Sequence, residues 1–218
     1  MKKDLVEIVF ILDRSGSMRG LEADTIGGFN QLLDKQKKEL GEAVISTVLF
    51  DHDFEVIHNR KSIQSIQPLT DKQYFVRGST ALLDAIGRSI IKIHDVHRVI
   101  GEDSVPEKTL FVITTDGMEN ASREFDWKTV KRLILQSQEK DGWEFVFLGA
   151  NIDAIQMASK MGITPDRATN YVPDDVGTET NFSVLNEEIA NFRTHKKLRE
   201  NWKETIEADY QTRTKKKS

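Results

Sequence analysis

The sequence of 218 residues contains no cysteine. Disulfide bonds, thiolate metal sites and cysteine nucleophiles are therefore excluded. No apolar segment approaches the roughly 20 residues that a membrane-spanning helix needs. The net charge is −4, whereas a nucleic-acid-binding domain is usually basic. We therefore expect a soluble cytoplasmic protein whose partners include no nucleic acid and no membrane.

Two phosphate-binding motifs are also missing. No G-x-x-x-x-G-K-[ST] is present, which excludes a P-loop nucleotide hydrolase, and no G-x-G-x-x-G follows a predicted strand, which argues against a dinucleotide site. The N-terminal lysines precede an apolar run, as in a signal peptide. However, Glu7 interrupts this run, Asp13 ends it, and no small-residue cleavage site follows, so the segment is predicted to be a strand.

Apolar β-branched runs alternate with segments of helical spacing along the chain. The connection at residues 51–53 is too short for a crossover, so it predicts an antiparallel hairpin with its second strand at the sheet edge. The expected fold class is α/β: a doubly wound, mostly parallel six-stranded sheet with one antiparallel edge strand and helices on both faces. The predicted strands are 6–12, 44–50, 54–58, 110–114, 145–149 and 168–172.

The composition changes after Pro173. We predict a sheet domain over 1–173, a charged helical extension over 174–210 that packs at least partly on the domain, and a disordered basic tail over 211–218. Within the first domain, Gly27-Gly28 falls in a segment of helical spacing, where glycine is unfavourable. Close packing of the backbone against the sheet is the expected reason.

Polar side chains follow the predicted strands where these strands end. Asp13, Ser15 and Ser17 follow the first strand, Thr80 opens a helix after Gly78-Ser79, and Asp116 follows a central strand. Open α/β sheets bind their ligands at this edge. Carboxylate and hydroxyl oxygens suit a hard divalent cation. The alternative for the first loop is an ordinary turn and helix N-cap, because Asp and Ser favour both.

This combination resembles the von Willebrand factor type A (VWA) domain, a Rossmann-like fold, and its metal-ion-dependent adhesion site (MIDAS). The family motif is Asp-x-Ser-x-Ser, with a threonine in a second loop and an aspartate in a third. The segments around these loops, 21–30, 78–86 and 113–120, are similar to those of prokaryotic stand-alone members. The resemblance spans roughly residues 5–172, which is most of the chain.

The resemblance implies a role for each of the five residues. The hydroxyls of Ser15 and Ser17 would bind a divalent cation directly, and Thr80, Asp13 and Asp116 would bind it directly or through water. The implied cofactor is Mg²⁺, or else Mn²⁺ or Ca²⁺. The metal would complete its coordination with an Asp or Glu of a partner protein. The implied function is a metal-dependent protein-binding module rather than an enzyme.

Two other functions stay open. One is a magnesium-dependent phosphoryl-transfer hydrolase, because haloacid-dehalogenase-like phosphatases also place an aspartate after the first strand. Those enzymes need a second aspartate two residues on, where this chain has Ser15. The other is a structural scaffold without metal, whose thermal stability would not respond to added Mg²⁺ or Mn²⁺.

Other polar residues offer further candidate sites. The Asp-His-Asp sequence at 51–53 could bind a metal, but its place between two strands favours an ordinary hairpin turn. Arg14 and Arg19 flank the first loop, where they could attract an acidic partner or simply be exposed. Glu119 and Asn120, beside the third loop, could shape which partner docks, but the favoured interpretation is that they are solvated loop residues.

Overall fold

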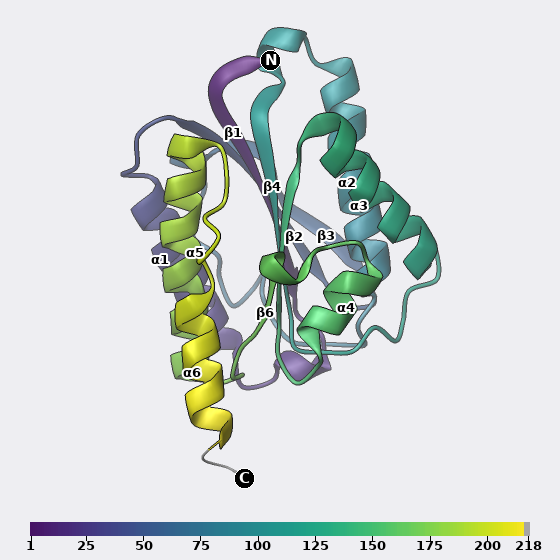
Figure 1. Cartoon of the computed structure of the whole chain (residues 1–218), viewed down its shortest axis with the longest axis vertical. Coiled ribbons are helices and arrows are strands. Elements are labelled where there is room, and N and C mark those ends of the chain that lie inside the picture. The colour runs from purple at the N-terminus through teal and green to yellow at the C-terminus, as the bar shows by residue number, and fades with distance from the viewer. Residues whose placement is uncertain (216–218) are drawn as a thin grey trace.

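The computed structural model describes residues 1–215, and it shows a central sheet with helices on both faces (Figure 1). The sheet has six strands in the order β3-β2-β1-β4-β5-β6. Only β3 is antiparallel to its neighbour, and it lies at the sheet edge. The predicted fold class is therefore confirmed. The strands are β1 (Lys2–Asp13), β2 (Glu42–Phe50), β3 (Phe54–Ser62), β4 (Pro106–Thr115), β5 (Glu144–Gly149) and β6 (Ala168–Asn170).

The two central strands, β1 and β4, carry the first and third candidate loops. They pair in parallel, and Leu12 lies opposite Thr114. Every residue of β1 from Leu5 to Asp13 is buried. A parallel strand covered on both faces needs such a mostly apolar run, in which Glu7 is the one polar residue between Leu5 and Leu12. Because the two strands share one direction and register, the loops that follow Asp13 and Thr115 leave the sheet side by side.

The edges of the sheet differ from its centre. The last five residues of β3 are polar, and only His58 in this strand is buried. Its pairing with β2 shifts register twice, and Arg60 has a positive φ of 48°. At the opposite edge, β6 is three residues long. Both edges are therefore short or irregular.

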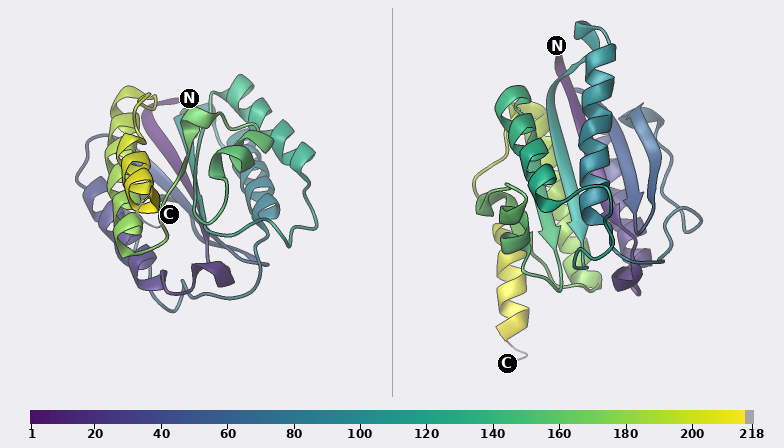
Figure 2. Two further views of the ribbon diagram at one scale, coloured as in Figure 1. Left: turned by 60° about the horizontal axis from the view of Figure 1, so that its bottom comes forward. Right: turned by 90° about the vertical axis from the view of Figure 1, so that its right-hand side faces the viewer.

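The helices form two layers, one on each face of the sheet (Figure 2). Buried side chains of α1 and α5 join one core cluster with β1 and β4, and those of α2, α3 and α4 join a second cluster on the other face. No helix within residues 1–215 is long and apolar enough to cross a membrane. The helices are α1 (Glu22–Gln36), α2 (Leu82–Val99), α3 (Trp127–Asp141), α4 (Ala154–Lys160), α5 (Asp175–His195) and α6 (Glu204–Lys215), with 3₁₀ turns at Gly16–Met18, Ile63–Ser65, Glu102–Ser104 and Pro165–Arg167.

The C-terminal region is more ordered than its polarity indicates. α5 begins at Asp175, where the Asp174 carboxylate caps it by accepting from the Gly177 amide at 2.9 Å. The prediction of a disordered tail from residue 211 is wrong for 211–215, which form the end of α6. There Arg213 donates to both carboxylate oxygens of Asp174, at 2.8 and 2.9 Å, and also pairs with Asp209. Residues 216–218 of the predicted tail lie outside the described residues.

The two adjacent glycines of α1 have different surroundings, because Gly28 is closely packed and Gly27 is not. A Cβ added at Gly28 would lie 2.2 Å from the Phe182 ring of α5, so the close approach is to a helix and not to the sheet as expected. Apart from its chain neighbours and the backbone of its own helix, no heavy atom of the described residues lies within 4 Å of a Cβ added at Gly27. Gly28 therefore has a packing reason that Gly27 lacks.

Replacement of these two glycines by alanine should change stability in opposite directions. Gly27→Ala should raise the free energy of unfolding by about 0.5–1 kcal/mol, because alanine restricts the unfolded chain and favours helix. Gly28→Ala should lower it by about 1–3 kcal/mol, because the methyl group overpacks the contact with Phe182. Urea denaturation of both variants measures the two effects. A stabilising Gly28→Ala would contradict this account of the α1–α5 contact.

Candidate metal site

The first candidate loop leaves the sheet at Asp13, the last residue of β1. A hydrogen bond within the loop stabilises its conformation, because the Ser15 amide donates to Asp13 Oδ1 at 2.6 Å. A 3₁₀ turn follows at Gly16–Met18, and the buried side chain of Met18 anchors it. Ser15 is buried while Ser17 is exposed, so the loop presents hydroxyls from the interior to the surface.

Three hydroxyl groups from two loops meet at this edge of the sheet. Ser15 Oγ lies 3.0 Å from Ser17 Oγ and accepts a hydrogen bond from Thr80 Oγ1 at 2.9 Å. A Cβ added at Gly117 would lie 2.8 Å from both Ser17 Oγ and Thr80 Oγ1. Glycine at 117 therefore lets the third loop approach the hydroxyls, and any side chain there would fill the space between them.

The two carboxylates of the cluster have raised pKa values. Burial raises the pKa of Asp13 to about 6, although hydrogen bonds from Thr115 and Ser15 lower it, and repulsion from Asp116 adds to the rise. Burial also raises the pKa of Asp116, while its interaction with the Ser17 hydroxyl lowers it. Both negative charges are thus under-compensated by the protein, and a nearby cation would stabilise them.

The donor set fits a hard divalent cation. Asp116 is 3% exposed, and its Oδ1 has no hydrogen-bond partner among the described residues. An orphaned buried carboxylate oxygen is costly unless something binds it. The oxygens of the five predicted residues, Asp13, Ser15, Ser17, Thr80 and Asp116, are of the type that Mg²⁺, Mn²⁺ and Ca²⁺ prefer.

Two residues that sequence reasoning missed hold Asp13 in place. The Thr115 hydroxyl donates to Asp13 Oδ2 at 2.5 Å, and the Tyr74 hydroxyl donates to the Asp13 carbonyl at 2.5 Å. Thr115 could have been found, because it directly precedes Asp116 at the end of a strand that neighbours β1. Tyr74 has no such signal, since it comes from an irregular loop 61 residues further along the chain.

The third loop is bound to the start of α2. Asn120 Oδ1 accepts from the Thr80 backbone amide at 2.9 Å, and the backbone amide of Asn120 donates to the Thr80 carbonyl at 3.0 Å. Glu119 accepts from the Leu83 amide at 2.9 Å and from the Ser122 amide at 2.8 Å. The interpretation of Glu119 and Asn120 as merely solvated residues is therefore wrong, because they fix Thr80 relative to Asp116.

The two arginines of the first loop have different environments. Arg19 is exposed, as one of the two interpretations holds. Arg14 is fully buried, so it cannot meet a partner surface directly and neither interpretation applies to it. Its guanidinium binds Asp51 Oδ2 at 2.9 Å, Glu55 Oε2 at 2.7 Å and the Gln73 carbonyl at 3.1 Å.

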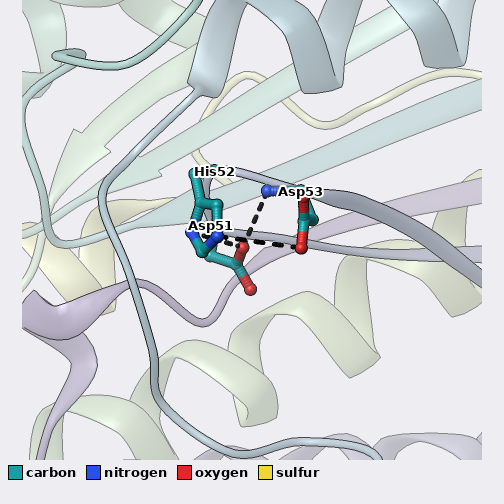
Figure 3. A group of neighbouring side chains, drawn as sticks. All are labelled: Asp51, His52 and Asp53. Atoms are coloured by element: carbon teal, nitrogen blue, oxygen red, sulfur yellow. Dashed lines mark hydrogen bonds and ion pairs between the residues drawn. The ribbon is translucent and has the colours of Figure 1, made fainter.

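The Asp-His-Asp sequence forms the turn between β2 and β3 (Figure 3). One ligand atom from each of Asp51, His52 and Asp53 lies within 4.8 Å of the others, which is close enough for a shared cation. Asp51 and Asp53 already have protein partners, however. Asp51 Oδ1 accepts from the Asp53 amide at 2.7 Å, and Asp51 Oδ2 accepts from the Nε atoms of Arg14 and Arg77, each at 2.9 Å.

No family model matches the sequence, and no curated protein matches it significantly. Solved structures share its fold. One is proximal thread matrix protein 1 from the mussel byssus with a zinc-occupied MIDAS motif, at 14% identity and a TM-score of 0.57, covering 85% of this chain and 46% of that chain. Another is a von Willebrand factor type A protein from Catenulispora acidiphila, at 14% identity and a TM-score of 0.55, covering 84% and 42%.

The pilus adhesin SpaC from Lactobacillus rhamnosus GG is a third similar structure. It is 12% identical, has a TM-score of 0.62, and is matched over 87% of this chain and 30% of that chain. This chain thus spans less than half the length of each of the three structures. Similarity at such low identity establishes a shared fold.

Proposed function

Because the chain has the von Willebrand factor type A fold, we propose that it is a divalent-metal-dependent protein-binding module whose metal site is a MIDAS. The observation that carries the proposal is the cluster of three hydroxyls and two under-compensated carboxylates at the carboxyl edge of the sheet. The zinc-occupied MIDAS motif of the mussel protein, which shares this fold, supports it.

The proposed roles follow from the environment of each residue. Ser15, Ser17 and Thr80 would hold the cation through neutral hydroxyl oxygens, and Asp13 and Asp116 would hold it directly or through water. A bound cation with so few anionic ligands supplies an electrophilic centre that attracts a carboxylate from another molecule. We propose Mg²⁺ as the cation, with Mn²⁺ and Ca²⁺ as alternatives.

The surface beside the cluster is open to a partner. Ser17 and Asp116 line a cavity of about 480 Å³ together with Arg19, Asp24 and Asp175. Met118, one residue beyond Gly117, is 67% exposed. We propose that a partner protein places an Asp or Glu on the metal here, and that the module binds without catalysing a reaction. The cytoplasmic location and the prokaryotic type expected from the sequence stay predictions.

Calorimetric titration of the metal-stripped protein with Mg²⁺ and Mn²⁺ tests the metal site. We expect saturable binding to one site, and we expect Asp116→Asn to abolish it because that variant removes a charge from the cluster. Asp24→Asn is the matched control, since Asp24 lines the same cavity outside the cluster and its loss should leave the affinity within a factor of about 3. Bound metal should stabilise the fold by about 2.7 kcal/mol at 100-fold excess over Kd.

Two results would contradict the proposal. Absence of binding, together with unchanged thermal stability at millimolar metal, would favour the metal-free scaffold. Magnesium-dependent phosphatase activity that is lost in Asp13→Asn would favour the phosphoryl-transfer hydrolase. Partner recognition is tested with pairs of peptides that differ only by Asp→Asn or Glu→Gln. In each pair, only the peptide with the acidic residue should bind the protein, and chelation of the metal should abolish that binding.

A further inference from the structure

We infer that Asp51 is a positioning residue of the proposed metal site, which it serves by joining two of the metal-binding loops through Arg14 and Arg77. The inference rests on the proposed function and adds a residue to it. Asp51 is fully buried at the turn after β2, and its Oδ2 accepts from Arg14 Nε and Arg77 Nε at 2.9 Å each. We refer to these three residues as the arginine clamp.

Each arginine of the clamp belongs to a different metal-binding loop. Arg14 lies between Asp13 and Ser15, and Arg77 lies three residues before Thr80. The loops also bind each other, because the Arg77 amide donates to the Arg14 carbonyl and the Gly16 amide to the Gly78 carbonyl, both at 3.0 Å. The clamp therefore spans the same two loops whose hydroxyls must meet at the cation.

The backbone of Asp51 reinforces the connection. Its carbonyl accepts from the Ala81 amide at 2.8 Å, directly after Thr80, and the neighbouring Phe50 carbonyl accepts from the Arg14 amide at 2.8 Å. One turn of the β2–β3 hairpin thus contacts the residue after Asp13 and the residue after Thr80. Displacement of this turn would change the 2.9 Å separation of Ser15 Oγ and Thr80 Oγ1.

The charges show why Asp51 acts through arginine and not as a ligand. Burial would raise the pKa of Asp51, but hydrogen bonds from Asp53, Arg77 and Arg14 outweigh it and hold the pKa below its usual value. A cation at the Asp-His-Asp turn would lie beside the two guanidinium groups that donate to Asp51 Oδ2, and both would repel it. Figure 3 shows the three residues of the turn, and the Asp51 carboxylate drawn there is the one that Arg14 and Arg77 bind.

The test compares four variants by calorimetry with Mg²⁺ or Mn²⁺. Asp51→Asn removes the charge that joins the arginines, and Arg77→Gln removes one arm of the clamp at a side chain that is 38% exposed and so less critical for folding. Asp95→Asn and Arg98→Gln are matched controls outside the clamp, because this ion pair lies on the surface of α2 with side chains 57% and 76% exposed. We expect Asp51→Asn and Arg77→Gln to raise Kd about 10-fold or more, as outer-shell substitutions do, and the controls to stay near wild type.

A second measurement does not depend on metal. In the metal-stripped protein, amide hydrogen exchange at 14–17 and 78–81 should be faster in Asp51→Asn and Arg77→Gln than in wild type and the controls, because the clamp orders both loops. Unchanged exchange in both clamp variants overturns the inference, and so does wild-type affinity in both. Metal binding that survives in Asp116→Asn but is lost in His52→Ala would also overturn it, by placing the cation at the Asp-His-Asp turn.

The two proposals can fail separately. If wild type binds no metal, the proposed function fails, and the exchange rates still show whether the clamp orders the loops. If wild type binds metal and both clamp variants bind it equally well, the proposed function stands and the clamp has no positioning role.

Discussion

The metal-stripped Asp13→Asn variant should be more stable than wild type by roughly 3 kcal/mol at pH 7.5, and the two should be equally stable near pH 3.5. Burial raises the pKa of Asp13 from 3.8 to about 6. The folded protein therefore binds the proton of the Asp13 carboxyl group more tightly than the unfolded chain does. The contribution of the protonated Asp13 carboxyl to the free energy of unfolding is therefore complete below pH 3.8 and is lost as the pH rises through 6.

The asparagine can keep the local hydrogen bonds. Its oxygen can accept from the Ser15 amide, and its amide can donate to Thr115 Oγ1, because a hydroxyl can accept as well as donate. Denaturation of both proteins at a series of pH values gives the difference in their free energies of unfolding. Groups that titrate equally in both proteins cancel in this difference. A constant difference between pH 4.5 and 7.5 would show that Asp13 does not titrate near 6. Added Mg²⁺ should stabilise wild type and not the variant.

Arg193→Met should lower the free energy of unfolding by about 3 kcal/mol. Arg193 of α5 is 4% exposed, and its guanidinium donates to five oxygens around the end of α1. The shortest of these bonds are to the Gln36 carbonyl at 2.6 Å and the Gly41 carbonyl at 2.8 Å. Without the guanidinium, the carbonyls at the end of α1 lose their hydrogen-bond donor, and those that are buried cannot form hydrogen bonds with water instead.

Two controls separate this capping from a general effect of charge. Arg193→Lys should restore little stability, because one ammonium group cannot replace a planar fork with several donors. Arg98→Met should change stability by less than about 0.5 kcal/mol, because the Arg98 side chain is 76% exposed and pairs only at the surface with Asp95. A loss below about 1 kcal/mol in Arg193→Met would contradict the capping role.

The sheet could be predicted from the sequence because its signals are local. A strand buried on both faces is largely apolar, and its end is marked by a polar residue such as Asp13 or Asp116. Parallel pairing then brings the polar ends together at one edge. The hydroxyl cluster of Ser15, Ser17 and Thr80 is accordingly found where the strand order places it.

The features that sequence reasoning missed depend on partners far apart in the chain. Arg14 has the sequence context of an exposed loop residue, and its burial depends on Asp51, 37 residues away. The start of α5 lies where the helical extension was predicted, but the Asp174 cap and its contact with Arg213, 39 residues further on, could not be predicted. Non-local ion pairs leave no periodic pattern in a sequence.

The irregular edges of the sheet bear on how this protein can associate. A long, flat edge strand offers free amides and carbonyls to a strand from another molecule, and so favours stacking into larger sheets. Here β3 is twisted by two register shifts and carries Arg60 and Lys61 near its end, and β6 is too short to template a partner. Strand addition is thus disfavoured at both edges. Any partner would be recognised through side chains on loops and helices, whose identity evolution can change without altering the sheet.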